Sequence, residues 1–344
     1  MGNTILTPGM LSTQIAKGAF KPNIYLTNMS MAYFQGMDKY VAKEIFPMLP
    51  VPLSTASYYK FSKADLARDN VGRKPQFGKV DPAQMGITDD SYRCYVDQVI
   101  VGLDQIGTLD FTRSKAPGVA DPRRAKARFI AEQMNIHLDI LFAQSFFQPG
   151  VWGNEWTGAA AHSGANKEFI KFNDDNGDPV KLFDELCTNI EQEGRRRPNK
   201  LALGVNAYNA LKNHPAILER VKFGGSSANP ATVNQNVLAQ LFGLEKVAVL
   251  ASTYNAAGLG EKENMQFICN SNDALLCYTT NTPAIDEATA GYIFTWDMLG
   301  DGNFMPTLQY DGEGGTHAEF MEGLIATDMK KTADDLAVYL HGCI

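Results

Sequence analysis

Hydrophobic residues recur with helical spacing in some stretches of this chain and with strand spacing in others. The longest helical pattern lies between residues 121 and 148, where the apolar positions are Ala127, Ile130, Met134, Leu138 and Leu141. Intervals of three and four place these side chains on one helical face. Asp121 is the expected cap, Pro122 the first helical residue and Pro149-Gly150 the end. At 1.5 Å per residue, this helix would be ~40 Å long.

Shorter patterns predict further elements along the rest of the chain. Helices are expected at about 28–46, after the Asp178-Pro179 pair up to Gly194, after a cap at Asn206, from Pro215, and from a cap at Thr232 to Gly243. Strands are expected at Leu201–Leu203, Val247–Leu250, Met265–Ile268, Ala274–Tyr278, Tyr292–Trp296, Glu319–Thr327 and Leu336–Cys343. Residues 151–178 are predicted to be a loop. Helices and strands mix without regular alternation, which favours an α+β fold.

Residues 53–103 have a pattern of their own. Two strand-like stretches, Ser57–Ser62 and Tyr92–Leu103, flank a polar segment rich in Gly and Pro, so we predict a long hairpin reaching ~50 Å. A two-stranded ribbon is marginally stable alone, and we therefore expect it to lie on a neighbouring molecule. A hairpin folded back on its own domain is the alternative. We also expect the second stretch to share one sheet with the two C-terminal strands, beneath the long helix.

Composition limits the function classes. The chain has 344 residues, 44% hydrophobic and 20% charged, which indicates one large or two modest folded domains. Its net charge of −7 is unlike that of a sequence-independent DNA binder, although a container for DNA need not be basic. Five scattered cysteines indicate reduced thiols in a cytoplasmic setting. Because no run of about 18 apolar residues occurs, no membrane span is expected.

The residues that usually carry chemistry do not form a recognisable site. The five histidines lack metal-ligand spacing, and the acidic residues 174–178 lack the spacing and closing Glu of a calcium loop. Residues 312–316 (GEGGT) lack the Lys of a phosphate loop, and no GxSxG motif occurs. We therefore predict no catalytic, cofactor-binding or metal-binding residues, and no cofactor.

Basic residues occur in three informative places. Four of them lie in the first turns of the long helix: Arg123, Arg124, Lys126 and Arg128. Positive charge there opposes the helix dipole, so a neighbouring subunit's carboxylates or DNA phosphates could offset it; a solvated face is the alternative. Arg195, Arg196 and Arg197 follow Gly194 at a helix C-terminus, where cations are favoured. The hairpin segment carries Lys60, Arg68 and Arg73 beside Asp69.

Three stretches resemble tailed-bacteriophage major capsid proteins. They are residues 195–223 (RRRPNKLALGVNAYNALKNHPAILERVKF), 40–69 (YVAKEIFPMLPVPLSTASYYKFSKADLARD) and 333–340 (ADDLAVYL). Arg68 and Asp69 fall on the family's "RD". The resemblance implies the Hong Kong 97-type capsid fold, with these parts: an N-terminal arm (1–52), an extended loop (53–103), a peripheral domain with a long spine helix (104–178 and 297–344) and an axial domain (179–296).

The resemblance implies a structural protein and not an enzyme. Many copies would form pentamers and hexamers of an icosahedral shell that encloses double-stranded DNA without sequence-specific binding. The protein would reside in the virion after assembly in the host bacterial cytoplasm, with scaffolding, portal or decoration proteins as candidate partners. The candidate inter-subunit contact residues are Lys60, Arg68, Asp69, Arg73, Arg123 and Arg124. An encapsulin-like shell of the same fold is the nearest alternative, and a soluble α+β enzyme is the alternative from another class.

Overall fold

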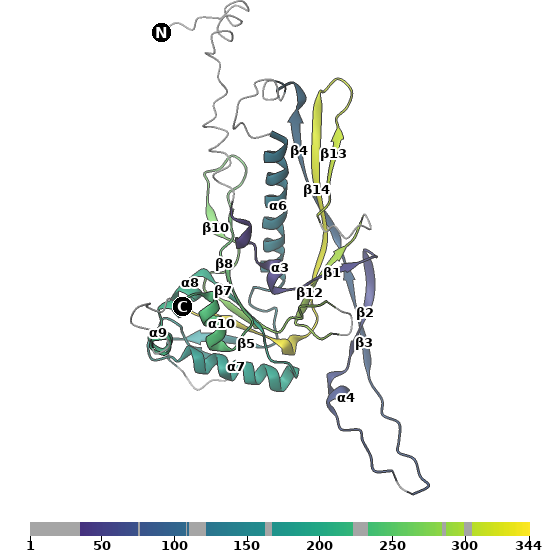
Figure 1. Cartoon of the computed structure of the whole chain (residues 1–344), viewed down its shortest axis with the longest axis vertical. Helices are drawn as coiled ribbons and strands as arrows, with labels where there is room; N and C mark the ends of the chain where they lie inside the picture. The colour runs from purple at the N-terminus through teal and green to yellow at the C-terminus, as the bar shows by residue number, and fades with distance from the viewer. Residues whose placement is uncertain are drawn as a thin grey trace, which may run out of the picture. The chain divides into compact units, whose positions relative to one another are not determined.

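The computed structural model describes residues 35–74, 76–107, 109, 122–161, 167–222, 233–283, 287–298 and 305–344. These residues fall into two compact units (Figure 1). The smaller unit holds the described parts of 1–36, 98–133 and 307–323, and the larger holds those of 37–97, 134–306 and 324–344. Three elements contribute residues to both units: helix α6 (Pro122–Ser145) and strands β4 (Tyr95–Asp104) and β14 (Ala318–Lys331).

A six-stranded sheet forms the centre of the larger unit, in the order β6-β5-β15-β11-β7-β8. Its strands are β5 Glu155–Ala159, β6 Glu168–Ile170, β7 Lys200–Gly204, β8 Lys246–Leu250, β11 Ala274–Cys277 and β15 Ala337–His341. β11 is antiparallel to both β7 and β15, whereas β5, β6 and β8 join through parallel pairs. The mixture of strand directions with several helices confirms the α+β class.

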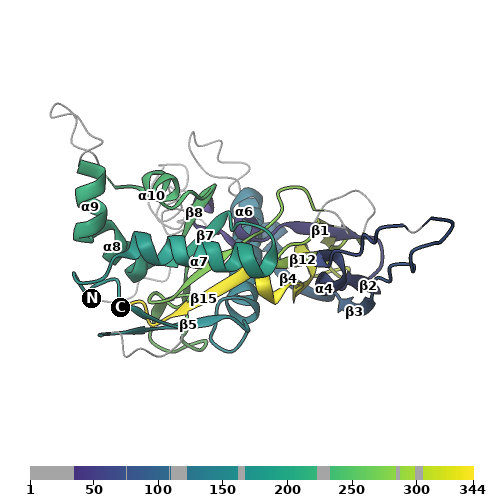
Figure 2. The ribbon, with the colours of Figure 1, turned by 90° about the horizontal axis from the view of Figure 1, so that it is seen from below.

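Both faces of this sheet are buried. Successive side chains of a strand point to opposite sides, so neighbouring residues of one strand lie in different clusters. Leu201 and Leu203 of β7 lie in one hydrophobic cluster, and Ala202 between them lies in another. Four helices cover the first face: α7 Pro179–Gly194, α8 Val205–Asn213, α9 Pro215–Lys222 and α10 Gln235–Phe242 (Figure 2). The second face packs against Phe142 and Phe146 at the end of α6 and just beyond it.

The remaining strands form smaller groups. In the larger unit, β1 (Met48–Val51) is parallel to β12 (Gly291–Trp296), which is antiparallel to the end of β14. In the smaller unit, the start of β14 is antiparallel to β13 (Thr307–Asp311). β4 also pairs with β14. A separate two-stranded hairpin in the larger unit consists of β9 (Thr253–Asn255) and β10 (Met265–Phe267).

Several predicted elements are confirmed with their end signals. The Asp178 carboxylate accepts hydrogen bonds from the backbone N–H groups of Val180 (3.2 Å) and Lys181 (3.4 Å), and Pro179 stands in the first turn of α7. α7 ends at Gly194, as predicted. The long helix α6 is also confirmed; its expected cap, Asp121, lies outside the described residues.

The predicted helix at about 28–46 is wrong for the part that the structure describes. Residues 35–46 contain only a 3₁₀ turn, η1 (Met37–Lys39), and the single turn α3 (Ala42–Ile45). Tyr40, Val41 and Ala42 are buried in direct succession. Because three consecutive residues cannot share one face of a helix, this segment packs by contacts on more than one side.

The predicted partner of the first hairpin strand is also wrong. β2 (Thr55–Phe61) pairs with β3 (Ile87–Arg93), whereas the predicted partner 92–103 is mostly β4, which pairs with β14. β3 reads ITDDSYR. Its side chains are largely exposed, so no hydrophobic period marks it as a strand. The hairpin itself is confirmed, with its second strand earlier in the chain than predicted.

The expected single sheet of 92–103 with both C-terminal strands is likewise wrong. β15 lies in the six-stranded sheet between β5 and β11, and Ala337, Val338, Tyr339 and Leu340 are all buried there. A fully buried strand needs strands on both edges to satisfy its backbone groups, and β5 and β11 supply them. β14 alone pairs with β4.

Three local predictions also need correction. The predicted loop at 151–178 contains the short strands β5 and β6, which form one edge of the six-stranded sheet. Asn206 does not cap α8; it lies inside the helix and donates to Ser271 Oγ and Asn272 Oδ1. The cap of α10 is Asn234, which accepts from the backbone N–H of Val237 at 2.9 Å. The predicted cap, Thr232, lies outside the described residues.

Candidate inter-subunit surfaces

The hairpin has almost no core of its own. Seven residue pairs join β2 to β3, from Thr55 opposite Arg93 to Phe61 opposite Ile87, a length of ~20 Å. The side chains of β2 alternate between exposed and half-buried. Beyond the paired region come helix α4 (Lys63–Ala67) and a tip of irregular chain up to Gly86. A ribbon this thin buries little apolar surface by itself.

Large apolar side chains are exposed along the whole hairpin. They are Tyr59, Phe61, Leu66, Val71, Phe77, Val80, Met85 and Ile87. Val71 is 89% exposed and Phe77 is 98% exposed, and the backbone of Phe77 is left-handed, with φ 65°. Left-handed backbone is uncommon for a bulky residue, and a concentration of exposed apolar side chains usually marks an interaction surface.

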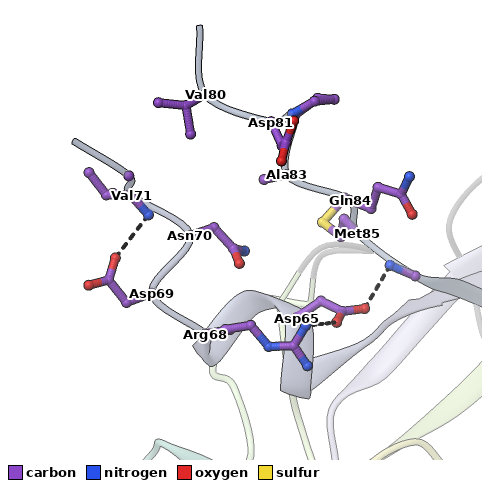
Figure 3. Close-up of a pocket in the computed structure, with 13 residues that line it drawn as sticks. Asp65, Arg68, Asp69, Asn70, Val71, Val80, Asp81, Ala83, Gln84 and Met85 are labelled. Carbon is purple, nitrogen blue, oxygen red and sulfur yellow. Dashed lines mark hydrogen bonds and ion pairs between the residues drawn. The ribbon is translucent and has the colours of Figure 1, made fainter. Parts of the chain in front are cut away.

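A cavity of about 650 Å³ lies between the two limbs of the tip (Figure 3). It is lined by Asp65, by residues 68–72 and by residues 80–86. The Asp65 carboxylate accepts a hydrogen bond from the Gly86 N–H at 3.0 Å, which holds the pKa of this carboxyl below its usual value. Arg68 lies 3.8 Å from the same carboxylate. These contacts connect the two limbs where the cavity begins.

The predicted contact residues of the hairpin have partners within the chain. Lys60 lies 2.7 Å from Asp90 across the ribbon and holds the pKa of that carboxyl down. Arg68 pairs with Asp65, and the Asp69 carboxylate accepts from the N–H of Val71 at 3.0 Å. Arg73 is exposed on the tip. A role for these four residues between subunits stays a prediction.

Arg123 has a partner within the chain that the sequence did not predict. Its guanidinium lies 2.7 Å from the Glu319 carboxylate, whose side chain is 3% exposed. Gln309 donates a hydrogen bond to the other oxygen of that carboxylate. Arg123 therefore neutralises an internal carboxylate, and Arg124 is exposed on α6; a role between subunits stays a prediction for both.

Replacing Arg123 by methionine should lower the free energy of unfolding by about 1–2 kcal/mol, because a buried carboxylate loses its cation while Arg123 itself is half exposed. The matched control is Arg124→Met, the neighbouring exposed arginine, which should change stability by less than about 0.5 kcal/mol. Urea denaturation of both variants gives the comparison. Equal effects would show that the Glu319 pair adds no stability.

The residues of the described ranges do not suggest chemistry. No group of three His, Cys, Asp or Glu side chains among them could hold a metal ion. All five cysteines are free and buried, and burial raises the pKa of Cys187 to about 11 and of Cys277 to about 12. Such thiols are poor nucleophiles at neutral pH. Within the same ranges, none of the helices is both long enough and apolar enough to span a bilayer.

Two residues that the sequence did not single out as contacts connect α4 to the end of α7. Lys63 Nζ donates to the backbone oxygen of Glu193 at 2.8 Å and pairs with Asp335. Arg195 Nη1 donates to the backbone oxygen of Leu66 at 3.3 Å. In sequence, these partners lie well over a hundred residues apart, so no local pattern reveals them. The one available signal is that Arg195 follows the C-terminus of α7, where a cation is favoured.

Comparisons with known proteins agree with this architecture. The major capsid protein of Burkholderia phage BcepMu is 21% identical over 235 residues, which cover 67% of this chain and 68% of that protein. This similarity agrees with the resemblance to phage major capsid proteins seen in the sequence. No family model matches it. A phage-related protein from Bordetella bronchiseptica RB50 has a TM-score of 0.64 at 16% identity, covering 93% of this chain and 96% of the other.

Two further structures share the Hong Kong 97-type capsid fold of this chain. The capsid of a native GTA particle has a TM-score of 0.52 at 10% identity, covering 89% of this chain and 91% of that one. The holo-SrpI encapsulin complex from Synechococcus elongatus PCC 7942 has a TM-score of 0.50 at 10% identity, covering 98% and 96%. At 10% identity, the likeness to these two structures shows the shared fold.

Proposed function

We propose that copies of this chain assemble through pentamers and hexamers into an icosahedral shell that encloses double-stranded DNA. The observation that carries the proposal is the hairpin, because its exposed apolar residues, with Val71 and Phe77 the most exposed, need another surface to cover them. The BcepMu relative is named a major capsid protein, which supports this function.

In this proposal, contacts between subunits replace an active site. The hairpin segment 53–103 lies on a neighbouring copy, and the segment 179–296 surrounds the symmetry axis of each pentamer or hexamer. The arm 1–52 and the peripheral segments 104–178 and 297–344 complete the contacts between copies. Each contact can be weak, because several neighbours hold one subunit at the same time.

The charge of the chain supports enclosure of DNA without sequence-specific binding. A net charge of −7 gives no overall attraction to phosphate, and specific readout would require side chains placed in a groove. The proposed shell is therefore a container, assembled in the bacterial cytoplasm, with scaffolding, portal or decoration proteins as further partners.

An encapsulin-like shell is the second candidate. It is favoured by the likeness to the SrpI encapsulin complex, which covers nearly the whole of both chains. The contents of purified particles separate the two candidates: packaged double-stranded DNA supports the phage capsid, and a packaged enzyme supports the encapsulin-like shell.

The double substitution Val71→Ser with Phe77→Ser should abolish closed particles in negative-stain electron microscopy while leaving subunit stability within about 0.5 kcal/mol of the original, because both side chains are exposed in the free subunit. The matched control is Leu259→Ser, an exposed apolar residue outside the hairpin, which should assemble normally. Normal particles from the double variant would contradict the role proposed for the hairpin.

A further inference from the structure

Helix α4 stands in the middle of the hairpin and joins its two limbs. On one side of it lie the paired strands β2 and β3, and on the other lies the tip. The N–H of Ser62 donates to the oxygen of Gly86 at 2.8 Å, and the N–H of Gly86 donates to the Asp65 carboxylate at 3.0 Å. Whatever holds α4 therefore holds both limbs of the hairpin at this level.

The contacts of α4 with α7 are reciprocal. The last carbonyl groups of a helix lack intrahelical partners, and the negative end of the helix dipole favours a cation there. Lys63 of α4 donates to Glu193 O in the last turn of α7, and Arg195, which follows α7, donates to Leu66 O in the last turn of α4. Each helix thus supplies the cation that caps the other. We call these four residues the reciprocal cap.

Further contacts hold Arg195 and Lys63 of the reciprocal cap in place. Arg195 has a left-handed backbone, with φ 60°, and its N–H donates to Glu191 O at 3.0 Å. Lys63 also pairs with Asp335 on the turn that precedes β15. Figures 1 and 2 both show α4 beside the C-terminal end of α7.

The hairpin has a second attachment at the opposite end of its paired region. The N–H of Arg93 donates to the Asp328 carboxylate at 2.8 Å, and Tyr92 stacks on Phe294 with ring centroids 4.6 Å apart. Seven residue pairs, ~20 Å of ribbon, separate this attachment from the reciprocal cap. A ribbon held at one point can swing about it, whereas a ribbon held at two points has a fixed direction.

We propose that Lys63 and Arg195 are positioning residues that fix the direction of the hairpin on the larger unit, so that its tip reaches one place on a neighbouring copy. This inference rests on the proposed function for its consequence in the shell. Without the reciprocal cap, the hairpin swings about its attachment at Arg93. With the cap in place, only residues 68–85 beyond α4 can adapt to the neighbour.

The test is the double substitution Lys63→Met with Arg195→Met in the full chain. Spin labels on Ala64→Cys and Glu185→Cys, both at exposed positions, report the distance between α4 and α7, since the five native cysteines are buried. The distance distribution should broaden, and the amide of Leu66, which donates to Ser62 O, should exchange about tenfold faster with solvent. The single variant Lys63→Arg, which keeps the cation, should retain the narrow distribution.

A matched control removes two cations from the other end of α7. Lys181→Met with Arg220→Met eliminates two partners of Asp178 and changes the net charge equally, yet should leave the distribution narrow. An unchanged distribution in the Lys63/Arg195 variant, or equal broadening in the control, overturns the proposal. These distances are independent of particle formation, so failure of the original chain to form shells would overturn the proposed function alone.

Discussion

Replacing Phe46 by alanine should lower the free energy of unfolding by about 3–5 kcal/mol, the range for truncating a large buried aromatic residue. Phe46 is 0% exposed and stacks on Phe146, with ring centroids 4.2 Å apart. Phe142 and Trp152 surround the same ring at 6.0 Å and 6.4 Å. Because α6 and the six-stranded sheet hold this cluster from both sides, the cavity that the substitution leaves cannot collapse readily.

The control for this substitution is Phe61→Ala on the exposed ribbon, which should cost less than about 0.5 kcal/mol in the free subunit. Chemical denaturation followed by tryptophan fluorescence measures both, since Trp152 reports on the cluster directly. Similar losses for the two variants would mean that the segment before β1 contributes little to the core.

A buried carboxyl should make stability fall as the pH rises. Asp139 on α6 is 2% exposed; burial raises its pKa to about 6, although hydrogen bonds from Ser252 and from the N–H of Ala42 oppose the shift. The nearby Lys43 has a pKa lowered by burial, and its Nζ donates to Asn135. The buried thiol of Cys269 faces the carboxyl without neutralising it.

The raised pKa of Asp139 determines how the free energy of unfolding changes with pH. Between about pH 4 and pH 6 the folded protein keeps the Asp139 proton that the unfolded chain releases, so this stability is fully present at about pH 4 and lost as the pH rises through 6. A shift of about two pKa units corresponds to ~3 kcal/mol. The difference in unfolding free energy between Asp139→Asn and the original chain should therefore change by ~3 kcal/mol, in favour of the variant, from about pH 4 to pH 8.

Urea denaturation at a series of pH values gives this difference, and Asp184→Asn, at an exposed carboxyl on α7, is the control that should show no such trend. A difference that stays constant with pH would mean that water or a structural change relieves the burial of Asp139.

The sequence predicted an element well wherever a local signal coincided with burial. Asp178-Pro179 started α7 because the cap and the proline act within one turn. β7 was recognisable because Leu201 and Leu203 are buried in a run with clear ends. Two strand-like stretches around a polar segment identified the hairpin, and the structure shows that it has little core of its own.

Predictions failed where the deciding contacts were distant. β3 has no apolar period because its ribbon is largely exposed, so its pairing with β2 could not be read from ITDDSYR. Lys60 meets Asp90 because the register of two separate strands brings the side chains together, and its role between subunits stays a prediction. Arg123 finds its carboxylate 196 residues away.

By itself, the sequence determined the α+β class, the long helix, the N-cap of α7 and the resemblance to phage major capsid proteins, because these depend on periodicity and on short stretches of chain. Only the tertiary structure decided that β15 joins the six-stranded sheet, that Asp139 is buried beside α3, and that Lys63 and Arg195 connect α4 to α7. Strand order, burial and ion pairing depend on which distant segments are brought together, and the local pattern of residues does not encode that.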